Sequence, residues 1–173
     1  MVTRRQTLAE GIDMMPIRVK QIYIAAPFFS HKQLAIVEEV EKLIHEVGLV
    51  YYSPRSDGIL QSMTPAERIA QAPKIFKTNC VHVANADAVL ALLDDHDTGT
   101  YWEMGFAYAI RRYNLQQHWY RIFAFTTQRP TLNVMLQQSV DAHACGLEEL
   151  KTMLTDFAQG KPLVKPQPTE NVV

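Results

Sequence analysis

The sequence predicts a three-layer α/β/α domain built on a central parallel sheet of four to five strands. Short β-rich runs alternate along the chain with segments whose apolar residues recur at helical spacing. One run, Asp87 to Leu93 (DAVLALL), is almost entirely apolar, as a strand covered by helices on both faces must be. Residues that punctuate secondary structure, such as Pro27, Gly48 and Pro54, separate the segments.

The individual elements follow from the same pattern. The expected strands cover residues 21–26, 49–53, 87–93 and 121–127, and the expected helices cover 31–47, 64–83, 100–112, 132–140 and 147–157. The helix that starts at Thr64-Pro65-Ala66-Glu67 has a capping-box spacing with proline at its first position, and Pro73 is expected to break or kink it. Strands joined by helices favour right-handed crossovers and a flavodoxin-like arrangement.

Composition and charge narrow the class of protein. Apolar residues make up 47% and charged residues 20% of the chain, the balance of an ordinary globular protein. The 17 basic side chains oppose 18 acidic ones, which argues against a nucleic-acid coat or a polybasic membrane anchor. No apolar run approaches the ~20 residues of a membrane span. Cys80 and Cys145 fit no zinc spacing, so we expect buried reduced thiols and a cytoplasmic protein.

We expect one domain, over residues 21–159. Residues 1–20 are mixed in composition and are interpreted as a flexible N-terminal extension. Residues 160–173 contain three prolines and no hydrophobic period, which indicates an irregular tail. Ligands of open α/β sheets bind beyond the carboxyl ends of the strands. That rule selects residues 26–31, 53–58, 94–103 and 127–135.

The densest polar cluster spans residues 94–103 (DDHDTGTYWE), directly after the most apolar strand. Three aspartates at a strand end could bind Mg²⁺ or Ca²⁺, but the DxDxDG spacing is missing. A plainer interpretation is a polar loop in which Asp97 or Thr98 caps a helix. Asp97 lies six residues before Glu103, so the two carboxylates can also face one pocket.

Glu103 stands among apolar and small residues of the expected helix, with Gly105 two positions later. A carboxylate with such neighbours is either solvent-facing or functional. If it lies in the cleft, the positive end of the helix dipole helps to keep it ionised. Apolar walls would reduce its hydration and make it a better nucleophile.

Three other segments hold candidate ligand contacts. The first strand and its end offer Tyr23 and Phe29, whose rings can face a flat ligand, although a core strand with a turn has the same pattern. Arg55 and Asp57 stand in a polar turn of a kind that is most often only a turn. The stretch after Thr131 is interpreted as an ordinary helix start with Thr131 as a possible cap.

Several common catalytic motifs are absent from the sequence. It contains no GxGxxG or Walker loop, no GxSxG elbow and no histidine pair at metal spacing. No basic helix with interleaved aromatic residues suggests nucleic-acid recognition. We therefore expect no metal, no cofactor and no nucleic-acid partner.

Four stretches together match a known pattern: IYIAAPFF at 22–29, NADAVLA at 85–91, DTGTYWEMGFAYA at 97–109 and LNVM at 132–135. In them the chain, from about Gln21 to Ser139, resembles the nucleoside 2-deoxyribosyltransferases. The D-x-G-x-x-x-E-x-G-x-A pattern after an apolar strand is fairly specific, whereas any one piece alone is weak. The resemblance implies a flavodoxin-like fold and a retaining exchange of the base between 2′-deoxynucleosides and free nucleobases, with no cofactor.

The resemblance also implies roles for single residues. Glu103 matches the nucleophilic carboxylate that carries the covalent deoxyribosyl intermediate. Asp97, in a motif that includes Gly99, matches the acid that helps to place the deoxyribose. Tyr23 matches the tyrosine that orients the nucleophile, and Phe29 matches an aromatic wall of the pocket.

Other matches concern the base, the neighbouring subunit and the turn. Asn133 and Met135 match residues that a neighbour lends to the site, Asn133 towards the 5′-hydroxyl. The resemblance thus implies a homo-oligomer built from dimers, with a tetramer or hexamer as the larger form. Where family members often have an aspartate facing the base, this chain has Asn79, whose amide can hydrogen-bond a base edge but cannot deliver a proton. Arg55 and Asp57 are expected as further substrate contacts.

Three other functions stay open. An N-glycosidase of the same superfamily, acting on 2′-deoxynucleoside 5′-monophosphates, would need hydrogen-bond donors that bind the 5′-phosphate. The apolar stretch Ala25-Ala26-Pro27-Phe28 disfavours it, although Arg55 and Ser56 could serve a phosphate. A non-catalytic nucleotide-sensing module with the same fold would need no buried nucleophile. A carboxylate-bound metal enzyme is a more distant alternative.

Overall fold

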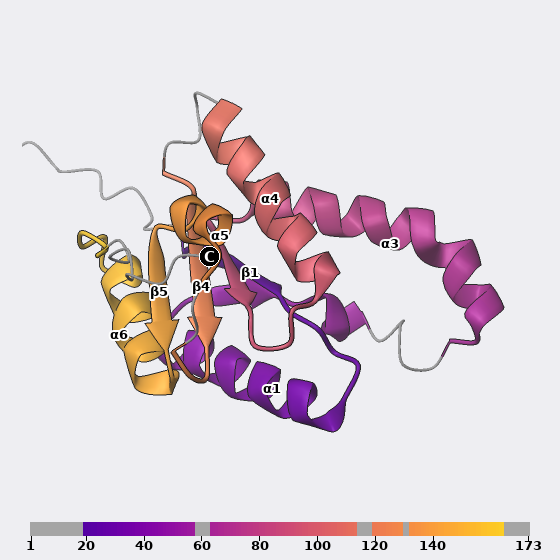
Figure 1. The fold of residues 1–173 in the computed structure, drawn as a ribbon, viewed down its shortest axis with the longest axis horizontal. Helices are drawn as coiled ribbons and strands as arrows, with labels where there is room; N and C mark the ends of the chain where they lie inside the picture. Colours follow the sequence, from indigo (N-terminus) through magenta and orange to yellow (C-terminus); the bar gives the residue numbers. More distant parts are fainter. Residues whose placement is uncertain (1–18, 58–62, 114–118, 130–131, 165–173) are drawn as a thin grey trace, which may run out of the picture.

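The computed structural model describes residues 19–57, 63–113, 119–129 and 132–164 (Figure 1). Within these ranges the strands are β1 (Gln21–Ala25), β2 (Val50–Tyr52), β3 (Ala88–Leu92), β4 (Arg121–Thr126) and β5 (Ala142–Cys145). The helices are α1 (His31–Glu46), α3 (Pro65–Asn85), α4 (Thr98–Tyr113), α5 (Val134–Ser139) and α6 (Leu147–Ala158), with a 3₁₀ turn η1 (Pro54–Asp57). Residues 1–18 of the expected N-terminal extension and the end of the expected tail, from residue 165, lie outside the described residues.

The strands form an all-parallel sheet in the order β2-β1-β3-β4-β5. This order confirms the predicted flavodoxin-like α/β/α fold. Strand β1 is flanked on both sides, and its Tyr23 pairs with Tyr52 of β2 and with Val89 of β3. Tyr23 therefore stands in the interior of the sheet and not at an edge.

The last strand and the helix before it differ from the expected elements. Strand β5 has the sequence AHAC, which is too short and too poor in β-branched residues to stand out, and it pairs with β4 through Ala144 opposite Phe125. Helix α5 is capped by Asn133, whose Oδ1 accepts a hydrogen bond from the Met135 N–H at 2.8 Å. Thr131, the expected cap, lies outside the described residues.

The long helices begin and end where local chemistry predicts. Ser30 caps α1 with a capping box closed by Gln33, and Gly48 follows the helix with a φ of 78°, which favours glycine. A second capping box starts α3 at Thr64. Pro73 lies inside α3 without ending it, so the helix is not broken there. Figure 1 instead shows the α3 ribbon changing direction in its N-terminal part.

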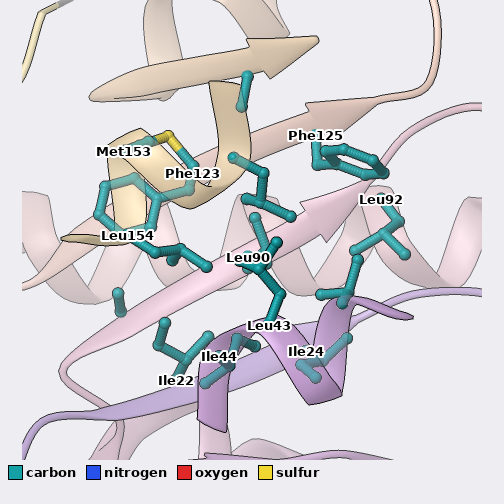
Figure 2. Close-up of a cluster of buried hydrophobic side chains, with 14 of the residues drawn as sticks. Ile22, Ile24, Leu43, Ile44, Leu90, Leu92, Phe123, Phe125, Met153 and Leu154 are labelled. Atoms are coloured by element: carbon teal, nitrogen blue, oxygen red, sulfur yellow. The ribbon is translucent and has the colours of Figure 1, made fainter. Parts of the chain in front are cut away.

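Alternating strand residues face two separate cores. Ile22, Ile24 and Leu90 pack with α1 and α6 on one face of the sheet (Figure 2). Tyr23 and Val89 face the other side, which α3, α4 and α5 cover. The pleat thus directs the Tyr23 ring towards α3 and α4.

Two smaller expectations were tested by the structure. None of the described helices is long and apolar enough to cross a membrane. Cys80 and Cys145 carry free thiols, but both are half-buried and not fully buried as expected.

Candidate active site

The Tyr23 phenol of β1 and the Glu103 carboxylate of α4 meet between the sheet and the helices that cover it. Tyr23 is completely buried, and its hydroxyl donates a hydrogen bond to Glu103 Oε1 at 2.5 Å. Glu103 is half-buried, and Thr100, Met104 and Ala107 around it form the buried stripe of α4. Helical spacing therefore turns Glu103 towards the sheet, which answers the choice between a solvent-facing and an inward carboxylate.

The surroundings of Glu103 destabilise its charged form. Burial raises the pKa of Glu103 to about 7, the hydrogen bond from Tyr23 lowers it, and the negative charge of Asp97 raises it. Burial first, and Glu103 second, raise the pKa of Tyr23 far above its ordinary value, so the phenol stays a donor. Among the described residues, no lysine, arginine or histidine forms an ion pair with Glu103. The site therefore favours the protonated form of Glu103 more than water does.

Asp97 both caps α4 and stands near Glu103. Its Oδ2 accepts hydrogen bonds from the Thr100 N–H at 2.7 Å and from the Thr100 hydroxyl at 2.9 Å, so the expected helix cap is confirmed. A Cβ built on Gly99 would lie 3.0 Å from Asp97 Oδ2. A side chain at position 99 would therefore crowd the carboxylate, which gives this glycine of the motif a physical reason.

The rest of the polar cluster is tied to its own neighbours. Asp94 accepts a hydrogen bond from the Thr127 N–H at 3.0 Å, and the His96 ring contacts the Tyr101 hydroxyl at 2.7 Å. In the described ranges, no group of three or more His, Cys, Asp or Glu side chains is arranged to hold a metal ion. The metal-enzyme alternative gains no support from this geometry.

Three further residues around the Tyr23–Glu103 pair were not selected as site residues from the sequence. The Tyr52 ring stacks on Tyr23 with centroids 5.8 Å apart, and the His82 ring stacks on Tyr52 with centroids 3.5 Å apart. Burial, and then the Glu103 charge, raise the pKa of the Cys80 thiol. The rule that ligands lie beyond strand ends could have found Tyr52, because it is the last residue of β2. No comparable signal marks Cys80 and His82, whose position depends on how α3 packs.

Comparison with known proteins decides the family. The family model described as nucleoside 2-deoxyribosyltransferase matches residues 22–159, which is most of the chain. The chain belongs to this family.

Solved structures support the assignment. The 2-deoxyribosyltransferase of the psychrotolerant bacterium Bacillus psychrosaccharolyticus is 26% identical, with a TM-score of 0.67 over 85% of this chain and 98% of that one. A CMP N-glycosidase of Clostridium botulinum is 15% identical, with a TM-score of 0.51 over 82% of this chain and 99% of that one, and it shows a shared fold alone. No match was found among curated protein sequences.

The structure brings some of the residues that the family resemblance selects together and leaves others apart. Tyr23, Asp97, Gly99 and Glu103 form one cluster, as described above. Asn79 is half-buried on α3, directly before Cys80. It therefore lies on the helix that borders Glu103.

The remaining expected contacts lie at the surface or elsewhere. The side chains of Phe29 and Met135 are each 75% exposed, and Asn133 is exposed at the start of α5. The Arg55 guanidinium binds α1, where its Nε donates to Glu41 Oε1 at 2.7 Å and its Nη2 to Glu41 Oε2. The hydrogen bonds of Arg55 thus point away from the Tyr23–Glu103 pair. The backbone of Asp57 ends η1.

Proposed function

We propose that the protein exchanges the base of 2′-deoxynucleosides by a retaining double displacement on Glu103. One observation carries the proposal: a half-buried glutamate without an ion-pair partner in the described residues receives a 2.5 Å hydrogen bond from a fully buried tyrosine. A carboxylate with a pKa of about 7 and no cationic partner among the described residues is typical of a catalytic group. Membership of the family supplies the class of substrate.

The reaction has two substitution steps. Glu103 attacks the anomeric carbon, a C–O bond forms, and the glycosidic C–N bond breaks, so that the first base leaves with the bonding electron pair and takes up a proton. A nitrogen of the second base then attacks the same carbon from the opposite face and loses its proton. The ester bond breaks and returns the Glu103 carboxylate. Two inversions give net retention, as in retaining glycosidases.

The geometry suits an oxocarbenium-like transition state. A fixed anion close to the anomeric carbon stabilises the developing positive charge, and more strongly in a site shielded from water. The Tyr23 hydroxyl holds one oxygen of Glu103 and leaves Oε2 for the sugar. The same contact, close to the position of C2′, would crowd a ribonucleoside. Water competes with the acceptor base, so slow hydrolysis is expected as a side reaction.

The other expected residues have supporting roles in this proposal. Asp97 Oδ2 accepts the hydrogen bonds of the helix cap, and in this proposal its Oδ1 holds the deoxyribose. Asn79 hydrogen-bonds the base edge without delivering a proton. Phe29 walls the pocket, and Asn133 and Met135 serve the site of a neighbouring subunit in a dimer-based homo-oligomer. The high exposure of Met135 supports this last role, because a large apolar side chain gains from cover by a partner.

The alternative functions have less support. Hydrolysis of a nucleoside monophosphate needs cations for the phosphate, whereas the Arg55 guanidinium is engaged by Glu41 and Glu38. Ala25, Ala26 and Pro27 at the end of β1 are buried and apolar. A non-catalytic nucleotide-sensing module would gain nothing from burying the Glu103 carboxylate without a cation to compensate its charge.

The test is an exchange assay with the full chain. Deoxyinosine and adenine should yield deoxyadenosine, and inosine in place of deoxyinosine should yield far less. A reaction without acceptor base measures hydrolysis. A nucleoside analogue with fluorine at C2′ of the sugar, which reacts slowly, should label the peptide that contains Glu103. Mass spectrometry of the digested protein identifies that peptide. Label on another peptide, or equal rates with inosine, would contradict the proposal.

A further inference from the structure

Three aromatic rings from three different elements form a column behind the proposed nucleophile. The Tyr23 and Tyr52 rings lie 5.8 Å apart at an angle of 25°, and the Tyr52 and His82 rings lie 3.5 Å apart at 4°. Tyr23 belongs to β1, Tyr52 to β2 and His82 to α3. The column therefore connects helix α3 to the hydroxyl that contacts Glu103.

A tyrosine places its hydroxyl oxygen through χ1, because the oxygen lies on the χ2 axis and does not move when the ring turns about it. The strand backbone fixes the Cα of Tyr23 but not χ1, and a small swing about χ1 moves the oxygen away from its acceptor. The Tyr52 ring packs against the Tyr23 ring, and the close, nearly parallel His82 ring restrains Tyr52 in turn. The stack thus restrains, from α3, the χ1 swing of Tyr23 that would break its 2.5 Å hydrogen bond to Glu103.

We propose that Tyr52 and His82 are positioning residues, whose stack holds the phenol of Tyr23 where its hydroxyl donates to Glu103. Neither residue needs to touch the substrate in this role. The proposal rests on the function proposed above, but it concerns the geometry of the carboxylate and can be tested apart from turnover.

The pH dependence of Glu103 reports on this geometry. Among the described residues, three titratable side chains interact with the Glu103 carboxyl group: Tyr23 of β1, Cys80 of α3 and Asp97 before α4. Tyr52 and His82 stand behind Tyr23 in the stack. Of the three that interact with Glu103, Tyr23 stabilises the ionised form through its hydrogen bond and so lowers the pKa of Glu103. If the stack is lost and the Tyr23 hydroxyl moves away, the pKa of Glu103 rises. The acid limb of the kcat/KM profile then moves to higher pH.

The experiment compares two substitutions of one residue in the full-length protein. His82→Ala removes the stacked ring, whereas His82→Phe keeps a ring and removes the imidazole. We expect His82→Ala to lower kcat by roughly tenfold with KM within about twofold, less than the 10²-fold loss that a 1 Å misplacement can cause. The acid limb of its kcat/KM profile should move to higher pH, as that of Tyr23→Phe should. His82→Phe should stay within about twofold of the wild type in kcat and should keep the wild-type acid limb.

A control variant, a second stack variant and a direct measurement of the Glu103 pKa complete the experiment. His45→Ala, on the exposed surface of α1, should leave kcat and the pH profile unchanged. Tyr52→Leu, which removes the middle ring, should reproduce the effect and serves if His82→Ala does not fold. The pKa of Glu103, measured by carbon-13 NMR of its carboxyl group, should rise in His82→Ala and Tyr52→Leu whether or not the protein exchanges bases.

Two outcomes would overturn the proposal. One is an unchanged Glu103 pKa and kcat in folded His82→Ala or Tyr52→Leu. The other is a loss in His82→Phe equal to that in His82→Ala, because the imidazole and not the stack would then be responsible. Failure of the proposed function looks different: the wild type shows no exchange, while the NMR titration still tests the positioning role.

Discussion

Two inward-facing glutamates, one buried and one half-buried, lie on opposite faces of the sheet and have opposite electrostatic surroundings. Glu41 of α1 is 5% exposed, and two nitrogens of Arg55 bind both of its oxygens. In the part of the chain that the structure describes, Glu103 of α4 receives a side-chain hydrogen bond from the Tyr23 hydroxyl alone, and burial raises its pKa to about 7. A carboxylate that is paired with a guanidinium has a structural role, because the pair compensates its charge. A carboxylate that is shielded from water without a cation has a perturbed pKa, which is typical of catalytic groups.

The difference comes from the partner and not from the helix. Both glutamates follow the inward spacing of an amphipathic helix, and both lie next to fully buried apolar residues. Arg55 reaches Glu41 from η1, directly after β2. Tyr23 reaches Glu103 from the interior of the sheet, where a neutral phenol fits and a cation would be costly to bury. The four predictions below test this contrast.

The largest effect should come from Glu103→Gln. The amide keeps the shape of the side chain and can accept the Tyr23 hydrogen bond, but it cannot form the sugar ester. Exchange should fall by at least about 10³-fold, as when a nucleophile is removed from other enzymes. Initial rates of deoxyadenosine formation measure the loss, with circular dichroism as the folding control. A variant that keeps more than a few per cent of the wild-type rate would rule out Glu103 as the nucleophile.

Asp97→Asn should have the next largest effect. Its amide oxygen can still cap α4 through Thr100, so the melting temperature should change little. The loss of the charge proposed to hold the deoxyribose should lower kcat by roughly 10²–10⁴. Because the Asp97 charge raises the pKa of Glu103, the acid limb should also move to lower pH. An acid limb that moves upward, or an unchanged kcat, would contradict this assignment.

The sequence predicts those parts of the molecule that depend on nearby residues. The capping box at Ser30 and the positive φ at Gly48 are local, so the bounds of α1 follow from the sequence. Asp97 and Glu103 are six residues apart, less than two helical turns, so their proximity could be expected. Strand β5 lacks a local signal, because AHAC gains its strand conformation only by pairing with β4.

Contacts between distant segments are the part that the sequence does not predict. Arg55 was expected to contact substrate, and its ion pair with Glu41 depends on the direction in which η1 leaves β2. The stack of His82 on Tyr52 depends on the packing of α3 over the sheet. In both cases the residue types are visible in the sequence, but the partner is decided by tertiary structure.

Glu41→Gln should destabilise the fold and leave the chemistry in place. The substitution removes the charge that compensates Arg55, whose side chain is 26% exposed. We expect a loss of about 2–4 kcal/mol in the free energy of unfolding, near the lower end for a broken buried pair because the guanidinium reaches solvent. Urea denaturation measures it, and Glu39→Gln on the exposed face of α1 is the matched control. Exchange should stay within about threefold; a loss of activity without a loss of stability would place Arg55 in the substrate site after all.

Glu103→Gln should have the opposite effect on stability, and only at higher pH. The pKa of Glu103 is about 7 in the folded protein against an ordinary value of 4.5, so folding favours the protonated form. Its contribution to stability is complete below about pH 4.5 and is lost as the pH rises to about 7. Above pH 7 the variant should therefore be more stable than the wild type by about 1–3 kcal/mol, and the difference should shrink towards zero at pH 5. Urea unfolding at pH 5, 6, 7 and 8 measures this difference. A variant that is less stable than the wild type at pH 8 would show that the Glu103 charge is compensated in the folded state, as that of Glu41 is.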